Sequence, residues 1–229
     1  MFLGERSAQA EYFDAPERTA EELRGHYAWL DRVNRWTRFE RPFRVWLPRL
    51  IPEARLASLD LLDVGAAEGA LGRTLSTWAA GRGWDWRFTD LDLSPHACAR
   101  NSNPRATVGS ATALPFEDGR FDVVVATTMT HHLPSEEAVA AHFREAARVA
   151  RHAVLICDMQ RSPLFYGMLW ALLRISGAPR EFREDGLLSV RRGWRREEWR
   201  RLADRAGLGT ARVWTEHGAH ILLSLSKPA

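Results

Sequence analysis

The chain contains 229 residues, of which 45% are hydrophobic, and its formal net charge at neutral pH is only +3. This length and apolar content predict one folded domain with an elaboration, and they exclude a mainly disordered protein. The arginines are spread along the chain and interleaved with acids. Because no basic face is evident, we expect no nucleic-acid partner.

Export and disulfide bonding are not indicated either. The two cysteines, Cys98 and Cys157, form no CxxC pair and cannot make a disulfide scaffold. The first residues contain no apolar signal core. These features predict a cytoplasmic location.

Three regions differ in their sequence pattern. Residues 1–55 are predicted to form a helical N-terminal cap, because apolar residues recur there near the helical period. The main domain is predicted over residues 56–229, and its part up to residue 158 alternates strand-like and helix-like runs. This alternation is typical of a parallel sheet covered on both faces. The predicted strands are 59–64, 84–91, 106–108, 121–126 and 153–157, and the predicted helices are 68–80, 95–100 and 136–149.

The last region breaks the alternation. A lid insertion is predicted at about residues 159–194, with an apolar run at Leu164–Ile175 and then an Arg-rich polar loop. A helix over 195–206 and two strands over 211–215 and 221–226 follow. The turn between these two strands, residues 216–220, is so short that the strands must be antiparallel. The predicted fold is therefore a Rossmann-like, doubly wound α/β sheet, mostly parallel with an antiparallel last strand.

The strongest local signal is the run LLDVGAAEGALG, which begins at Leu61. It indicates a buried strand, a turn of small residues and the start of a helix, where a ligand can approach the backbone and its free N–H groups. The GxGxxG pattern of dinucleotide sites needs glycine at positions 67 and 70, and both are alanine. Of the three glycines of a GxGxG turn, Gly65 and Gly69 are present.

Two acids flank this turn, Asp63 in the strand and Glu68 at the start of the helix. Carboxylates here repel a diphosphate but suit a ligand that carries an ammonium and a sulfonium group. The alternative is that Glu68 only favours the helix N-terminus and points into water.

A further acid, Asp92, follows Gly69 at about the spacing of a residue that binds ribose hydroxyls. Asp90 is a rival for this role. A third possibility is that Asp92 or Ser94 only caps the next helix.

Five motifs in this order resemble those of class I S-adenosylmethionine (SAM)-dependent methyltransferases. They are DVGAAEG (63–69), DLSP (92–95), GSATALPF (109–116), GRFDVVV (119–125) and HHL (131–133). The resemblance covers about residues 59–158 and implies a seven-stranded sheet with SAM as the cofactor. It places Asp63, Gly65, Ala67 and Gly69 at the methionine end of SAM, Asp92 on the ribose, and Leu93, Ser110 and Ala111 around the adenine. Thr127, at the end of a predicted strand, is also assigned to the cofactor site.

Two positions depart from the family pattern. Ala67 replaces the middle glycine, which we expect to be tolerated if the backbone φ there is negative. Ser110 replaces the usual aspartate, and an uncharged hydroxyl accepts a weaker hydrogen bond. Modest cofactor affinity is therefore expected. The alternative is a catalytically silent, methyltransferase-like binding or scaffold protein of a biosynthetic complex.

The flanking runs DRVNRW (31–36) and DGLLSVRR (185–192) resemble bacterial methyltransferases associated with polyketide and quinone biosynthesis. This resemblance implies a small hydrophobic aromatic substrate, phenolic, polyketide-derived or quinonoid, with O-methylation favoured. The apolar run from Leu164 is too short to span a bilayer. We expect it to be buried or to form a lid, in preference to contacting a membrane.

Three histidines are candidate catalytic residues, because a phenol hydroxyl benefits from a general base. His132 and His131 follow the strand over 121–126, at the sheet edge where such folds bind ligands, and His217 lies in the last turn. Each has a packing or capping role as its alternative. Asp158, at a strand end, either orients a substrate hydroxyl or caps the next segment. No carboxylate cluster is expected beside the two adjacent histidines, so no metal site is predicted.

Overall fold

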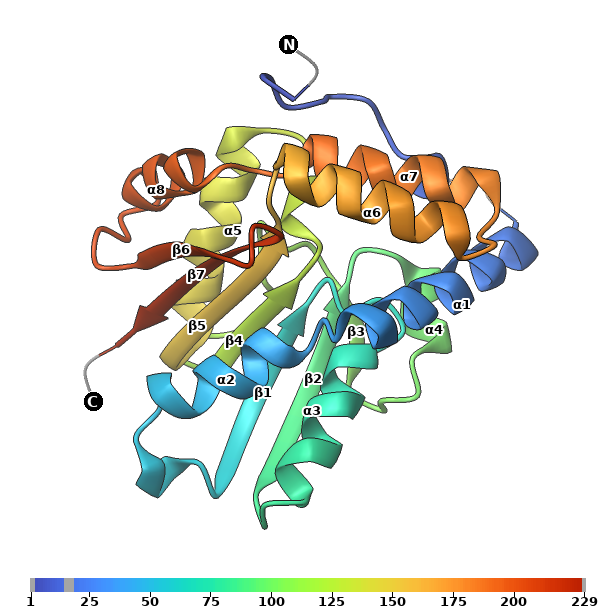
Figure 1. Cartoon of the computed structure of the whole chain (residues 1–229). Helices are drawn as coiled ribbons and strands as arrows, with labels where there is room; N and C mark the ends of the chain where they lie inside the picture. The colour runs from blue at the N-terminus through green and yellow to red at the C-terminus, as the bar shows by residue number, and fades with distance from the viewer. Residues whose placement is uncertain (1–2, 15–18, 228–229) are drawn as a thin grey trace.

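The computed structural model describes residues 3–14 and 19–227 and shows one central sheet with helices on both faces (Figure 1). The strands are β1 (Ser58–Val64), β2 (Asp85–Asp92), β3 (Ala106–Val108), β4 (Phe121–Thr127), β5 (Ala150–Met159), β6 (Arg212–Glu216) and β7 (His220–Ser226). The α-helices are α1 (Ala20–Thr37), α2 (Arg41–Leu50), α3 (Ala70–Ala80), α4 (Pro95–Arg100), α5 (Glu136–Val149), α6 (Pro163–Ile175), α7 (Arg180–Arg192) and α8 (Arg196–Arg205). Short 3₁₀ turns are η1 (Tyr12–Asp14), η2 (Glu53–Arg55) and η3 (Thr130–His132).

The seven strands lie in the order β3-β2-β1-β4-β5-β7-β6. Strands β1 to β5 pair in parallel, and β7 is antiparallel to both β5 and β6. The predicted fold class, including the terminal antiparallel hairpin, is confirmed. Parallel strands end at the same edge of a sheet, so the segments that follow β1, β2, β4 and β5 are brought together there.

Alternate residues of the parallel strands supply two separate cores. In β1, for example, Leu62 and Val64 face α5 and α8, whereas Leu59 and Leu61 face α2 and α3. Because both faces are covered, these strands are apolar almost throughout, as parallel sheets require.

Helix α2 belongs to the core on the α3 face of the sheet. This packing differs from the predicted division of the chain at residue 55. Its Phe43 and Leu47 are fully buried in the same cluster as Leu61 of β1. The helical prediction for residues 1–55 also fails at the start of the chain. Residues 3–11 lie outside any helix, while residues 1–2 and 15–18 are outside the described part.

The segment after β5 forms a helical pair, α6 and α7, and the predicted Arg-rich loop is wrong over most of its length. Helix α7 forms there because Phe182 and Val190 are buried against Leu169 and Leu173 of α6. Residues of α1 pack against the same cluster. Among the described helices, none is long and apolar enough to cross a membrane.

The N-terminal segment (residues 3–14) runs across α7 toward the carboxyl edge of the sheet (Figure 1). Arg6 fixes it there by donating to three backbone carbonyls, those of Arg192, His131 and Leu133. The backbone N–H groups of Tyr12 and Phe13 donate to the carboxylate of Asp185. This segment therefore joins α7 to the turn after β4.

Candidate active site

The glycine turn after β1 is held in place by the end of β2. The N–H groups of Gly65 and Ala66 both donate to the carbonyl of Leu91, at 2.7 and 3.1 Å. The backbone φ is positive at Gly65 (74°), Ala67 (48°) and Gly69 (78°). The condition for tolerating alanine at position 67, a negative φ, is not met, because the turn holds this residue in the left-handed region that favours glycine.

Close packing explains why the two glycines carry no side chain. A Cβ at Gly69 would lie 2.6 Å from both Asp90 Oδ2 and Asn101 Oδ1, and a Cβ at Gly65 would lie 2.7 Å from the Cβ of Met129. The structure therefore leaves no room for a larger residue at either position.

Asp63 is a buried carboxylate without a partner. Its side chain is 1% exposed, and neither oxygen accepts a hydrogen bond from any described residue. Burial, together with the nearby charges of Asp90 and Asp92, raises the pKa of Asp63 well above its usual range. Such a group is costly unless a donor binds to it. A ligand ammonium would supply that donor.

The two acids of β2 have different environments. Asp92 Oδ2 accepts from the N–H of Ala67 at 2.8 Å, and Oδ1 accepts from the N–H of Ser94 at 2.9 Å. Asp92 is half-buried at the rim of the turn, and each oxygen keeps a lone pair for a ribose hydroxyl. Asp90 is buried and holds Asn101 behind the turn. This arrangement favours Asp92 as the ribose ligand.

Glu68 does not add a free negative charge to the turn. Its carboxylate pairs with Arg100 at the end of α4. The negative charge available to a cationic ligand therefore comes mainly from Asp63 and Asp92, which corrects the expectation that Glu68 faces the ligand.

The residues assigned to the adenine lie along the ends of β2 and β3. Leu93 is largely exposed directly after Asp92, Ala111 is buried, and the hydroxyl of Ser110 lies 2.9 Å from that of Thr112. Thr127 ends β4 and is half-buried. An exposed leucine beside an uncharged polar loop is compatible with an adenine ring.

These residues fit SAM. The unpartnered Asp63 would hold the ammonium, Asp92 would hold the ribose, and Gly65 and Gly69 would let the ligand approach the backbone. When bound, SAM supplies an electrophilic methyl group on a sulfonium leaving group.

A buried histidine–aspartate pair lies at the same edge of the sheet. His131 lies in the turn after β4, and its ring Nδ1 is 2.7 Å from Oδ1 of Asp158 in β5. The backbone N–H of His131 donates to Oδ2 of the same carboxylate at 2.8 Å. Both side chains are at most 1% exposed. Burial by itself would raise the pKa of Asp158, but the facing His131 outweighs this effect and the pKa is lowered. Because a carboxylate only accepts, the proton of the imidazole is placed on Nδ1 and Nε2 is left as an acceptor.

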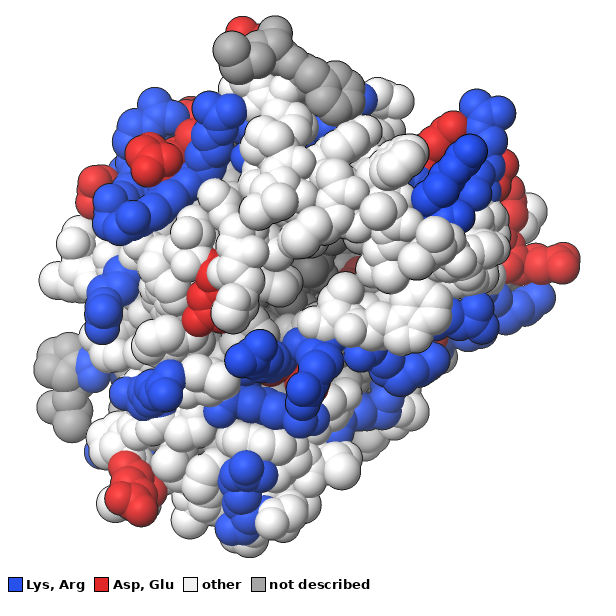
Figure 2. All heavy atoms as spheres, viewed as in Figure 1, with Lys and Arg blue, Asp and Glu red and all other residues white. Residues whose placement is uncertain are grey.

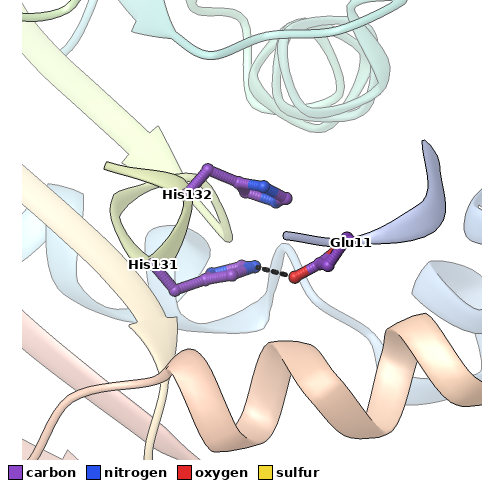
Figure 3. Close-up of side chains that lie close together, drawn as sticks. All are labelled: Glu11, His131 and His132. Carbon is purple, nitrogen blue, oxygen red and sulfur yellow. Dashed lines mark ion pairs between the residues drawn. The ribbon is translucent and has the colours of Figure 1, made fainter. Parts of the chain in front are cut away.

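Glu11 of the N-terminal segment faces the other side of this ring (Figure 3). Its Oε1 lies 3.8 Å from His131 Nε2 and accepts from the hydroxyl of Ser189 at 2.9 Å. Arg192 Nη1 is 3.4 Å from the same oxygen. The expectation that no carboxylate joins the histidines is therefore wrong.

Glu11, His131 and His132 each offer a ligand atom within 4.8 Å of the others, a spacing that could hold a metal ion. The guanidinium of Arg192, however, already neutralises the carboxylate of this set. A second cation at that oxygen would be repelled. The charge of Arg192 therefore disfavours a metal ion at this cluster.

His132 is more exposed than the adjacent His131. Its Nδ1 lies 3.1 Å from Asp14, which also accepts from Arg192 at 2.8 Å. Although burial opposes the change, hydrogen bonds from both partners lower the pKa of Asp14. His217 is exposed in the β6–β7 turn, at the predicted edge, and no described hydrogen bond or ion pair joins it to His131 or His132.

Sequence reasoning missed Glu11, Asp14 and Arg192 as neighbours of these histidines. Glu11 lies 120 positions before His131, and no motif surrounds it. Only the path of the N-terminal segment brings it into contact. The sequence indicates Asp158 only as a strand-end residue, and the structure shows that its partner is His131.

Comparison with known proteins identifies the domain and its fold. Residues 62–157 match the family model described as a methyltransferase domain. A solved structure from Methanococcus maripaludis, assigned as a SAM-dependent methyltransferase, has 18% sequence identity and a TM-score of 0.58, covering 94% of this chain and 97% of that chain. The complex of the Haloferax volcanii Trm112 methyltransferase activator with a methyltransferase gives 14% identity and a TM-score of 0.58, covering 96% and 100%. The CMeT domain of the citrinin polyketide synthase gives 15% identity and a TM-score of 0.53, covering 75% of this chain and 47% of that chain.

At these identities the solved structures establish the fold, and the family match establishes the domain. Residues 62–157 thus match a methyltransferase domain, and the chain has the fold of solved SAM-dependent methyltransferase structures. The chain is a methyltransferase enzyme, and SAM is its cofactor.

The strained alanine gives a stability test. Ala67→Gly should raise the free energy of unfolding by up to about 1 kcal/mol, because a left-handed alanine is disfavoured by that order. For a chain of this size the melting temperature should rise by roughly 2–4 °C. The matched control is Ala66→Gly, at a neighbour whose φ is not positive, which should lower the melting temperature. A fall for Ala67→Gly would contradict the strain.

Asp63 predicts opposite effects on stability and on binding. A carboxyl whose folded-state pKa is raised destabilises the fold above its ordinary pKa, and that cost disappears as the pH falls. Asp63→Asn should therefore raise the melting temperature at neutral pH.

The same substitution should weaken SAM binding, measured by calorimetry, by about 1.5–3 kcal/mol, because it removes a charged hydrogen-bond acceptor. In the unmodified protein the affinity should fall as the pH drops through the raised pKa, and Asp63→Asn should abolish that dependence. Asp60→Asn, in the same strand, should leave SAM binding unchanged. If the two variants bind SAM with equal affinity, Asp63 is not part of the cofactor site.

Proposed function

We propose that this enzyme transfers the methyl group of SAM to a hydroxyl oxygen of a small hydrophobic substrate, phenolic, polyketide-derived or quinonoid, with His131 as the general base. The observation that carries the proposal is the buried His131–Asp158 pair beside the glycine turn. A histidine oriented by a buried carboxylate is a recurring arrangement for proton abstraction.

In this mechanism each residue around His131 has a separate task. Nε2 of His131 accepts the proton of the substrate hydroxyl, which makes the oxygen a better nucleophile. Asp158 holds the ring through Nδ1–H and stabilises the imidazolium that forms. Alignment of the substrate in the closed site supplies much of the remaining rate enhancement, because oriented reactants gain several kcal/mol over a free encounter.

Glu11 occupies the position from which a hydroxyl would reach Nε2. Burial raises the pKa of Glu11, so this residue gives up its charge more easily than an exposed glutamate. We infer that the N-terminal segment shifts to admit the substrate and then covers it. His132 lies at the exposed side of this gap, where it suits substrate positioning better than proton abstraction.

The surroundings of the site support a hydrophobic substrate. Figure 2 shows a hollow between α6 and α1, at the place where Figure 1 draws the carboxyl ends of β1 and β4. Helix α6 carries a single charged side chain, Arg174, and the ring of His26 in α1 contacts the rings of both Phe13 and Phe182. The fold similarity to a polyketide synthase domain agrees with this class of substrate.

Substitution of the pair should separate base catalysis from positioning. His131→Ala and Asp158→Asn should each lower kcat by about 100-fold or more, the usual contribution of a positioned base, with little effect on SAM affinity. The matched control, His132→Ala, should lose less than tenfold. If His132→Ala has the larger effect, the base is His132 instead.

The acceptor atom is identified by its products. The enzyme should be incubated with methyl-labelled SAM and a panel of phenols and quinols. Its products should carry one added methyl group, and their fragmentation in the mass spectrometer should place that group on oxygen. Label on ring carbon would assign C-methylation. No product from any phenol or quinol would reject this substrate class.

A further inference from the structure

Helix α6 exposes an unusually apolar face. Its Leu164, Met168, Trp170 and Ile175 are 64%, 48%, 52% and 83% exposed, although the opposite face is buried against α7 and α1. Single exposed apolar residues are common, but four large ones on one short helix form a patch that normally has a partner. The sequence favoured burial or lid packing for this run, and the structure buries only one of its faces.

A row of arginines lies next to this patch. The segment from residue 32 to 52, which covers the end of α1 and all of α2, contains six arginines and one acid, Glu40. Glu40 pairs with Arg44 of the same helix, and Arg35, Arg38 and Arg41 are exposed. Figure 2 shows this band of positive side chains below the hollow, while the side chains over α6 above the hollow are uncharged.

We propose that this face, formed by α6 and the arginine row of residues 32–49, docks on the surface of an anionic lipid bilayer. Bulky apolar side chains with a tryptophan enter the boundary between headgroups and acyl chains, while arginines contact lipid phosphates. An acidic protein would match the arginines but would leave the four apolar side chains of α6 in water.

The geometry defines how the protein sits on the membrane. At 1.5 Å per residue, the 13-residue helix α6 is about 20 Å long, which is shorter than the roughly 30 Å of a bilayer core. Helix α6 therefore lies on the membrane and does not cross it. The hollow between α6 and α1 then opens toward the lipid, so an acceptor dissolved in the membrane reaches the site without passing through water.

Vesicle binding tests this surface independently of the methyl acceptor. The full chain should co-sediment with vesicles of phosphatidylcholine and phosphatidylglycerol at low salt. It should bind at least tenfold more weakly to phosphatidylcholine alone, or when the salt is raised to 0.5 M, because exposed charges are screened. Quenching of tryptophan fluorescence by brominated lipid should decrease in Trp170→Phe.

Variants assign the binding to this face. Met168→Ser/Ile175→Ser and Arg35→Gln/Arg41→Gln should each reduce vesicle binding tenfold or more while keeping SAM affinity, which shows that the fold is intact. The matched controls are Val108→Ser, an exposed apolar residue on β3, and Arg200→Gln/Arg201→Gln on α8, and these should bind as the unmodified protein does.

Three results would overturn the proposal. The first is absence of binding to anionic vesicles. The second is equal loss in the control variants. The third is conversion of a dimer to a monomer by Met168→Ser/Ile175→Ser in light scattering, which would assign the face to a second copy of the chain.

Discussion

The contact between His131 and Asp158 is the interaction on which the arrangement of the site depends. It joins the turn after β4 to the end of β5, and it is buried, so it requires the covering elements that exclude water from it. Removal of one partner leaves the other buried polar group unpaired, which strongly destabilises a protein, but such a pair seldom stabilises a fold more than an apolar pair of the same size. Its presence at the carboxyl edge is therefore better explained by chemistry than by stability.

The cover over this pair is built from segments that are distant in the sequence. Residues 3–14 supply Glu11 and Arg6, and α7 supplies Arg192 and Ser189. The contacts of Arg6 are polar and partly buried, whereas those that link Glu11 to Ser189 and Arg192 are buried. Because the cover is held mainly by these few polar contacts and not by a packed apolar core, it can open at a lower cost than the core beneath it. If His131 is the base, as proposed, this difference in local stability lets a substrate reach it.

The glycine turn shows a similar compromise between stability and function. Ala67 adopts a backbone conformation that alanine disfavours, and Asp63 is buried without a donor. Both features reduce the stability of the free protein, and both lie where a cationic cofactor would bind. Strain and unpaired polar groups collect at sites where a ligand completes the structure. The turn is therefore preorganised for a ligand.

The sheet, the antiparallel hairpin, the glycine turn and the acid of β2 could all be predicted from the amino-acid sequence. These features depend on local patterns, namely apolar runs, turn length and the spacing of a few residues along the chain. The other features of the site depend on contacts between distant segments. The tertiary structure buried His131 and left His132 exposed, paired Glu68 with Arg100, made a helix of the Arg-rich segment, and brought Glu11 to a histidine 120 positions away. Each of these outcomes depends on what packs against a residue from elsewhere in the chain, and no local pattern encodes that.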